Sequence, residues 1–180
     1  MNHFNFKSPK EFNIFPLQSI LSSGHSIMTR FAVAVLMVFI SIAGTAQPGN
    51  DLCSNATPIV LNGGNICGTT IGAGADNPNG GADCGTGADA SGVGVWYTFT
   101  GDGQVWDFLF PDMSGWDPEV NVYSGSCGAL TCVGGDDDSG SNYSAQFSIP
   151  TVAGTTYYVY VHDAFSSSTS DFCFTATPPT

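Results

Sequence analysis

The chain has 180 residues and a formal net charge of −12, and its three strong bases all precede residue 47. Residues 47–180 therefore carry 14 carboxylates and no lysine or arginine, which excludes nucleic-acid binding because phosphate recognition needs basic side chains. Anionic membrane surfaces are disfavoured for the same reason. A divalent cation is the partner that this composition favours, although solubility in a saline habitat would produce the same acidity.

The N-terminal segment, residues 1–46, has the pattern of an extension followed by a secretory signal peptide. Arg30 precedes an apolar run at residues 31–42, and small residues follow it. A bilayer span takes about 20 residues, so this shorter run predicts export, with cleavage before Gln47 and no transmembrane segment in the mature chain. Met28 is a natural start, which suggests an over-extended gene start, the alternative being an unusually long basic region.

The rest of the chain, residues 47–177, has the features of one all-β domain. Residues 93–100 alternate with period two, and a glycine-rich turn leads into residues 105–110, so we expect a hairpin. Further strands are expected at 58–61, 66–71, 119–123, 145–149, 155–162 and 172–177. About eight short strands in about 130 residues predict an antiparallel β-sandwich.

Two loops interrupt this pattern. Residues 72–92 form a long glycine-rich loop, and loops of this length are usually functional or disordered. Cys84 lies within it, which indicates that the loop is held in place. The second loop, residues 134–140, is acidic. Residues 178–180 look like the start of a linker or tail, so we expect either a fragment of a longer protein or one domain with a short tail.

All six cysteines lie after residue 47. In an exported chain they predict disulfides rather than a zinc site, and His162 is the only histidine there that zinc could use. Fifteen complete pairings are possible. The local spacing favours a Cys127–Cys132 disulfide. The other expected disulfides, Cys53–Cys67 and Cys84–Cys173, are weaker expectations.

Several segments, in this order, resemble those of bacterial pre-peptidase C-terminal domains and related collagen-binding-like domains. The segments are Val-Trp-Tyr-Thr-Phe-Thr-Gly at 95–101, Trp-Asp-Pro at 116–118, Val-Tyr-Ser-Gly at 122–125, Asp-Asp-Ser-Gly at 137–140 and the tyrosine-rich run at 154–161. The opening, Asn-Asp-Leu-Cys-Ser-Asn-Ala at 50–56, is similar to the form found in secreted proteins of Bacteroidetes-type bacteria. The resemblance covers about residues 50–177.

This resemblance implies a jelly-roll-like β-sandwich that accompanies secreted peptidases and adhesins and performs no chemistry itself. Some relatives bind calcium, and some bind collagen or insoluble polymers. The chain departs from the calcium-binding relatives at residues 92–95, where Gly-Val-Gly-Val replaces their carboxylates. Their metal site is therefore not expected at that position.

Two groups of oxygen-bearing side chains are candidate calcium sites, since calcium takes six to eight oxygen ligands. In an extended loop Asp136 and Asp138 point the same way and Asp137 the opposite way. The first group is Asp117, Asp136 and Asp138. The second group is Asn50, Asp51, Asp76 and Asp89. The alternative for the first group is a solvated acidic turn whose side chains accept hydrogen bonds from their own backbone.

Aromatic side chains offer a second candidate site. Trp96, Tyr158 and Tyr160 fall on the opposite strand face from the expected core, and if exposed they would form a patch for sugar rings or a collagen strand. The alternative is that the aromatic residues simply fill the interior. That interpretation is favoured for Tyr97, Phe99, Phe108 and Trp116.

An enzyme is not expected. His162 beside Asp163 is the only base for a nucleophilic relay, and the strand phase places it outward or in the next turn. The sequence predicts a non-catalytic secreted module, extracellular or at a bacterial cell surface, that positions a hydrolase or adhesin at an extracellular polysaccharide or protein. Neighbouring domains of a longer chain are further candidate partners. The alternative function is a structural subunit of a calcium-bridged surface layer or fibre.

Overall fold

The computed structural model describes residues 46–87, 90–111, 113, 115–164 and 167–178. The chain divides into two units, Met1–Gly44 and Thr45–Thr180. The first unit, which includes the expected leader and the start at Met28, lies outside the described residues. Within the described ranges, no helix has the length and apolar character needed to cross a membrane.

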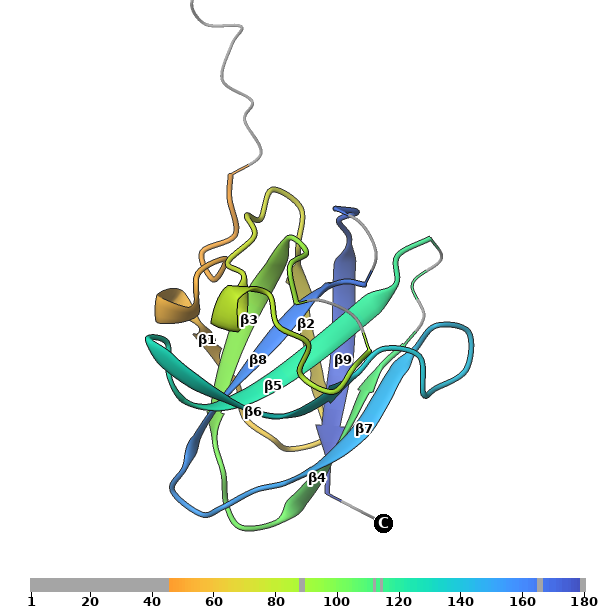
Figure 1. Cartoon of the computed structure of the whole chain (residues 1–180). Helices are drawn as coiled ribbons and strands as arrows, with labels where there is room; N and C mark the ends of the chain where they lie inside the picture. The colour runs from red at the N-terminus through yellow and green to blue at the C-terminus, as the bar shows by residue number, and fades with distance from the viewer. Residues whose placement is uncertain (1–45, 88–89, 112, 114, 165–166, 179–180) are drawn as a thin grey trace, which may run out of the picture. The chain divides into compact units, whose positions relative to one another are not determined.

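Two β-sheets pack face to face in the second unit (Figure 1). The strands are β1 (Thr57–Pro58), β2 (Asn65–Thr69), β3 (Gly94–Thr100), β4 (Val105–Phe110), β5 (Pro118–Ser126), β6 (Ala129–Asp136), β7 (Ala145–Pro150), β8 (Thr156–Asp163) and β9 (Asp171–Thr177). One sheet has the order β1-β3-β8-β5-β6 and the other β2-β9-β4-β7. Strands β1 and β3 are parallel, and the other described pairings are antiparallel. The predicted antiparallel β-sandwich is confirmed.

The expected hairpin between β3 and β4 is wrong, because these strands lie in different sheets. Strand β3 pairs with β1 and β8, whereas β4 pairs with β7 and β9. The glycine turn between them bonds to another turn: Gly101 N donates to Thr155 O at 2.8 Å, and Gly154 N donates to Gly101 O at 2.8 Å. Two adjacent turns thus satisfy each other's backbone groups where the chain crosses between the sheets.

Strand β6 was not expected from the sequence. Its residues, Ala-Leu-Thr-Cys-Val-Gly-Gly-Asp, lack the regular apolar alternation that marks the other strands. It is the edge strand of its sheet and pairs only with β5, with a register shift between Val122 and Tyr123 of β5. An edge strand is stabilised by one neighbour and is half exposed, so its sequence needs less apolar character than that of a central strand.

The inner faces of the two sheets bury the main core. Phe110 stacks on Phe174 with ring centroids 4.3 Å apart, and Phe99 stacks on Tyr157 at 5.1 Å. The other large aromatic members are Tyr97, Trp106, Phe108, Trp116 and Phe172. The prediction that Tyr97, Phe99, Phe108 and Trp116 fill the interior is confirmed.

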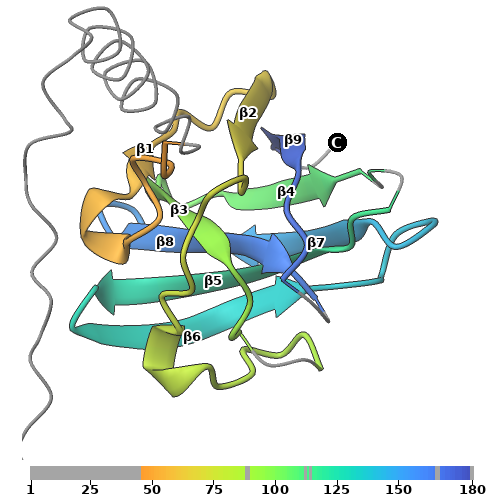
Figure 2. The ribbon, with the colours of Figure 1, turned by 90° about the horizontal axis from the view of Figure 1, so that it is seen from above.

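The outer face of the five-stranded sheet is also buried. Trp96, Tyr123 and Tyr160 are 0% exposed and form a second cluster with Cys53 and Cys84. The described residues of the 72–92 loop, 72–87 and 90–92, include the short 3-10 helix η2 (Pro78–Gly80) and cross the strands of this sheet (Figures 1 and 2). The N-terminal 3-10 helix η1 (Cys53–Asn55) contacts β3 beside it. We call residues 72–92 the covering loop.

The expected exposed aromatic patch is therefore wrong. Trp96 and Tyr160 are fully buried, and Tyr158 is half-buried against the same cluster. Strand periodicity correctly placed these side chains on the face opposite the core. It did not indicate that a loop with little secondary structure of its own would cover that face.

The three disulfides join Cys53 to Cys127, Cys67 to Cys173 and Cys84 to Cys132. All three expected pairings are wrong. Cys127 lies in the turn between β5 and β6 and Cys132 lies in β6, yet each bonds a different segment. The bond to Cys53 joins η1 to this hairpin, and the bond to Cys84 joins the covering loop to β6. Proximity in sequence was misleading, because the cover and the sheet meet only in the folded chain.

Candidate metal centre

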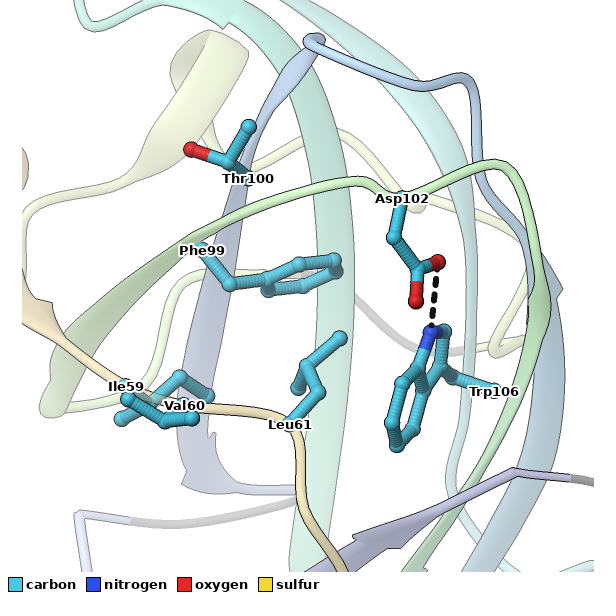
Figure 3. A pocket seen from close by; sticks show the side chains of 7 residues that line it. All are labelled: Ile59, Val60, Leu61, Phe99, Thr100, Asp102 and Trp106. Atoms are coloured by element: carbon cyan, nitrogen blue, oxygen red, sulfur yellow. Dashed lines mark hydrogen bonds between the residues drawn. The ribbon is translucent and has the colours of Figure 1, made fainter.

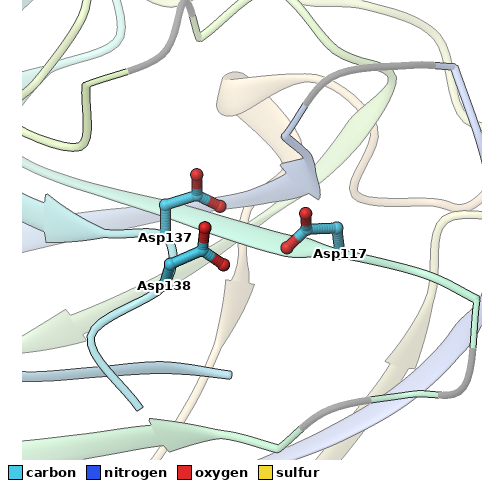
Figure 4. Close-up of side chains that lie close together, drawn as sticks. All are labelled: Asp117, Asp137 and Asp138. Atoms are coloured by element: carbon cyan, nitrogen blue, oxygen red, sulfur yellow. The ribbon is translucent and has the colours of Figure 1, made fainter. Parts of the chain in front are cut away.

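Three aspartates converge at one end of the five-stranded sheet. Asp117, Asp137 and Asp138 each offer an oxygen atom, and these atoms lie within 4.8 Å of one another (Figure 4). Asp117 immediately precedes β5, whereas Asp137 and Asp138 immediately follow β6. Antiparallel pairing places the start of β5 beside the end of β6, since Val120 pairs with Asp136. Topology thus brings together residues about twenty positions apart.

The structure replaces one of the expected ligands. Asp136 is not a member of the group, and its carboxylate accepts hydrogen bonds from Ser139 N at 3.1 Å and Gln146 N at 2.7 Å. Asp136 thereby ties the end of β6 to β7. The expected alternation assumed an extended backbone through residue 138, but β6 ends at Asp136 and the following turn directs Asp137 inward. The structure brings Asp117 and Asp138 together as expected, but Asp137 rather than Asp136 joins them.

Asp137 is the most informative member of the group. Its side chain is 7% exposed, and its Oδ1 atom has no hydrogen-bond partner in the described part of the chain. Burial, together with the negative charges of the neighbouring Asp117 and Asp138, raises the pKa of this carboxyl to about 7. A buried carboxylate without donors is unfavourable unless a proton or a cation neutralises it.

Two further buried carboxylate side chains, Glu119 and Asp163, lie next to this group. Glu119 is 0% exposed, and its Oε1 atom accepts hydrogen bonds from Thr86 Oγ1 at 2.5 Å and from Asn121 Nδ2 at 3.2 Å. Asp163 is 5% exposed and accepts a bond from Asp117 N at 3.3 Å. Neither Glu119 nor Asp163 was singled out as a ligand from the sequence, because its burial becomes evident only after the sheet and its cover assemble.

The described residues include no lysine or arginine that could pair with these carboxylates, since none follows Arg30 in the sequence. His162 is fully buried with Nε2 3.7 Å from Glu119 Oε2, but burial lowers its pKa to about 4, so it is neutral near pH 7. The hydrogen-bond network assigns the same state: Asn121 Nδ2 donates to His162 Nε2 at 3.0 Å, and Nδ1–H donates to Asp163 O at 3.0 Å. We therefore assign a neutral imidazole rather than an ion pair.

The strand phase suggested that His162 would project outward or into the next turn. His162 does lie on the outer face of the five-stranded sheet, but it is buried there against Gly92 of the covering loop. A Cβ atom on Gly92 would lie 2.8 Å from both His162 Nδ1 and Asp163 O, so only glycine allows this close approach of loop and strand. The imidazole is enclosed by protein, and the described residues around it include no serine or cysteine hydrogen-bonded to it as a nucleophile.

The group of three aspartates suits calcium better than zinc. Carboxylate oxygens in a flexible arrangement are the ligands that calcium prefers, with water and carbonyl oxygens completing six to eight positions. Zinc prefers nitrogen and sulfur donors, and all six cysteines are in disulfides. A bound dication would neutralise Asp137 and stabilise the neighbouring acids. The donor set therefore fits the expected calcium ion.

The described members of the second expected group have other partners. Asn50 Nδ2 donates to Trp96 O at 2.8 Å, and Asp76 Oδ2 accepts a bond from Cys53 N at 2.8 Å. Asp51 accepts a bond from the side-chain amide of Gln47. Each of these residues ties the N-terminal segment or the covering loop in place, and Asp89 lies outside the described residues. In the described ranges, only Asp117, Asp137 and Asp138 converge as a group of three acidic ligands.

A pocket of about 320 Å³ is a separate feature (Figure 3). It is lined by Ile59, Val60, Leu61, Phe99, Thr100, Asp102 and Trp106. Asp102 Oδ1 accepts a hydrogen bond from Trp106 Nε1 at 3.0 Å, and this bond lowers the pKa of the Asp102 carboxyl. The lining holds no histidine, cysteine or second carboxylate, so it offers room for an apolar group and no acid–base pair.

A comparison of the sequence with models of known protein families gave no match, and a comparison with curated proteins also gave none. The resemblance to pre-peptidase C-terminal domains therefore stays a prediction. The case for a metal centre rests on the geometry and burial of this chain's own residues.

Proposed function

We propose that the chain is a non-catalytic accessory module of the exported type, whose β-sandwich is stabilised by a calcium ion held by Asp117, Asp137 and Asp138. The observation that carries the proposal is the buried carboxylate of Asp137, which faces two other aspartates in a region without a cationic side chain. The ion joins the start of β5 to the end of β6. It thereby fixes the sheet end that also holds Glu119.

The cellular context of this proposal is an oxidising compartment outside the cytoplasm. Three disulfides in one small domain support export, because such bonds persist in secreted proteins. The module would position a hydrolase, an adhesin or neighbouring domains of a longer chain at an extracellular polymer. Since Trp96 and Tyr160 are buried, contact with a polymer would use other surfaces. The pocket beside Trp106 is one such surface.

The burial of Asp137 favours an internal ion over a bridge between copies. A cation that joins two molecules needs ligands that both can reach, and in this group only Asp138 is exposed. The calcium-bridged surface layer or fibre is therefore the less favoured function. Sedimentation with and without calcium distinguishes the two, since the bridging function requires self-association that depends on calcium.

The first experiment is thermal unfolding of the oxidised protein in EDTA, then in calcium, magnesium and sodium chloride at matched ionic strength. Calcium at about 100 times its dissociation constant adds roughly 2.7 kcal/mol of stability. For a domain of this size that corresponds to a rise in Tm on the order of 10 °C. The rise should be larger for calcium than for magnesium, because magnesium loses its water ligands reluctantly.

A matched pair of variants locates the ion. Asp137→Asn removes one buried carboxylate charge and should abolish most of the calcium response. Asp136→Asn changes the adjacent residue, whose hydrogen bonds hold β7, and should lower stability by about 1 kcal/mol while keeping the calcium response. Equal responses of the native protein to calcium, magnesium and sodium chloride would contradict the proposal. So would loss of the calcium response in Asp136→Asn but not in Asp137→Asn.

A further inference from the structure

The Cys67–Cys173 disulfide differs from the other two in its surroundings. Each of the other bonds has one deeply buried partner, Cys53 at 6% and Cys84 at 1% exposure. Cys67 is exposed, and Cys173 is partly exposed. This is the one disulfide of the three in which neither half is buried.

The strand register explains this exposure. Cys67 of β2 lies directly opposite Cys173 of β9. Phe172 and Phe174, on either side of Cys173, belong to the core between the sheets. Because side chains alternate along a strand, Cys173 and its partner point to the outer face of the four-stranded sheet. Strand β2 is also an edge strand, so β9 is its only neighbour in the sheet.

Burial also decides how readily each bond can be broken by a thiol. A thiolate attacks one sulfur and expels the other as a thiolate, so the leaving sulfur must accept a negative charge. A buried leaving sulfur is a poor one, because an apolar environment raises the pKa of its thiol. Attack at Cys127 would expel Cys53, and attack at Cys132 would expel Cys84, both buried. Attack at Cys67 expels Cys173, which solvent partly reaches.

We propose that Cys67–Cys173 is a site of thiol–disulfide exchange, which accepts a small thiol as a mixed disulfide while the other two disulfides stay intact. The incoming thiolate forms a bond to Cys67 Sγ as the Cys67–Cys173 bond breaks. Cys173 leaves as a thiolate and takes a proton from water. A second thiol molecule can then attack the mixed disulfide, which releases the small-molecule disulfide and leaves both cysteines reduced.

The surrounding charge favours a cationic thiol. Asp171 lies two residues from Cys173 on the same face of β9 and is exposed. No lysine or arginine follows Arg30, so no side chain of this domain attracts an anionic thiol. A small aminothiol such as cysteamine carries a positive charge and is the class of thiol that this surface would concentrate.

The fold should tolerate this reaction. Cys67 and Cys173 are held opposite each other by the backbone ladder between β2 and β9, which also pairs Ile66 with Phe174 and Gly68 with Phe172. Loss of the bond leaves these pairings available. The other two disulfides instead join η1 and the covering loop to the β5–β6 hairpin, where fewer backbone pairings replace them.

The test exposes the native oxidised protein to cysteamine for increasing times, followed by acid quenching, alkylation of free thiols and peptide mass spectrometry. Cysteamine adducts and alkylation should appear at Cys67 and Cys173 on the order of tenfold faster than at the other four cysteines. The same reaction in denaturing guanidinium chloride should remove this preference, because the fold no longer protects the other bonds. The double variant Cys67→Ser/Cys173→Ser, checked for its fold by circular dichroism, should take up no cysteamine over the same period.

The proposal is overturned if Cys53–Cys127 or Cys84–Cys132 reacts first or at the same rate in the native protein. It is also overturned if Cys67–Cys173 reacts only under conditions that unfold the whole domain. A double variant that still takes up cysteamine as fast as the native protein would point to one of the other disulfides. None of these outcomes depends on calcium, because the reaction is followed in EDTA.

Discussion

The two faces of the five-stranded sheet are both buried, but by different means. The inner face carries Val95, Val120 and Val159 and packs on the second sheet as an apolar core. The outer face combines large aromatic rings with buried polar side chains and lies beneath the covering loop. The polar members of this outer face are Glu119, Asn121 and His162.

This difference shows what a loop can bury that a second sheet does not. A sheet presents only side chains to its partner, because its backbone groups are used within the ladder. A loop also presents free backbone groups and short polar side chains. Tyr160 Oη donates to Gly92 O at 2.6 Å, and Thr86 Oγ1 donates to Glu119 Oε1 at 2.5 Å. The outer face can therefore be polar and buried at the same time.

The largest expected effect on the outer face comes from releasing the covering loop. The double variant Cys84→Ala/Cys132→Ala removes a bond with a sequence separation of 48 residues, which should cost about 4 kcal/mol of stability by the chain-entropy model. Hydrogen exchange should show loss of protection in the covering loop and around Trp96. Chemical denaturation measures the stability.

The matched control for this prediction is Cys67→Ala/Cys173→Ala, which removes the disulfide of the opposite sheet. By the same model its sequence separation of 106 residues gives an equal or larger loss of stability, about 5 kcal/mol. Protection around Trp96 relative to the rest of the domain should nevertheless remain, because that bond does not hold the covering loop. Equal loss of protection around Trp96 in both double variants would mean that the outer face depends on global stability and not on its own cover.

The next largest expected effect is the loss of stability at acidic pH that results from the burial of His162. Burial lowers the pKa of His162 from 6.5 to about 4, so the unfolded chain binds more protons than the folded chain between these values. The contribution of His162 to the free energy of unfolding is fully present above pH 6.5. It decreases as the pH falls, by about 3 kcal/mol at pH 4. Asp137 contributes the opposite sign, because its raised pKa favours the folded state at low pH. The contribution of His162 must therefore be isolated.

A comparison with His162→Gln isolates it. The amide can donate to Asp163 O and accept from Asn121, so it keeps the two hydrogen bonds without titrating. The stability difference between the native protein and this variant should shrink or reverse as pH falls from 6.5 to 4, measured by denaturant unfolding in EDTA. A difference that grows on acidification would indicate a protonated His162 paired with Glu119.

The smallest expected effect compares two tyrosines of the same buried cluster. Tyr160 Oη donates to Gly92 O, whereas Tyr123 Oη has no hydrogen-bond partner within the described ranges. Tyr160→Phe should therefore cost about 1 kcal/mol, and Tyr123→Phe should be neutral or stabilising by up to about 1 kcal/mol. Similar losses in both variants would show that a water or another group satisfies Tyr123. Thermal unfolding of the two variants measures the contrast.

The acidic cluster was partly predictable. The sequence placed Asp117 before one strand and Asp138 in an acidic turn, and both belong to the group. It assigned Asp136 in place of Asp137, because alternation holds only while the strand continues, and β6 ends at Asp136. The role of Asp136 in tying β6 to β7 depends on Gln146, which becomes its neighbour only after folding.

The sequence by itself determined the β-sandwich, most of its strands and four aromatic residues of its main core, Tyr97, Phe99, Phe108 and Trp116. These follow from local rules, since period-two alternation and turn residues act over a few neighbouring positions. It also established the absence of strong bases after Arg30, on which the case for a cation depends.

Only the tertiary structure decided the disulfide pairs, the separation of β3 and β4 into two sheets, and the burial of Trp96, Tyr160 and His162. Each depends on which distant segments meet. The covering loop has no periodicity that reveals the face it packs on, and it lies across that face because Cys84, Thr86 and Gly92 find partners there. Contacts between segments far apart in sequence become fixed only when the whole chain folds.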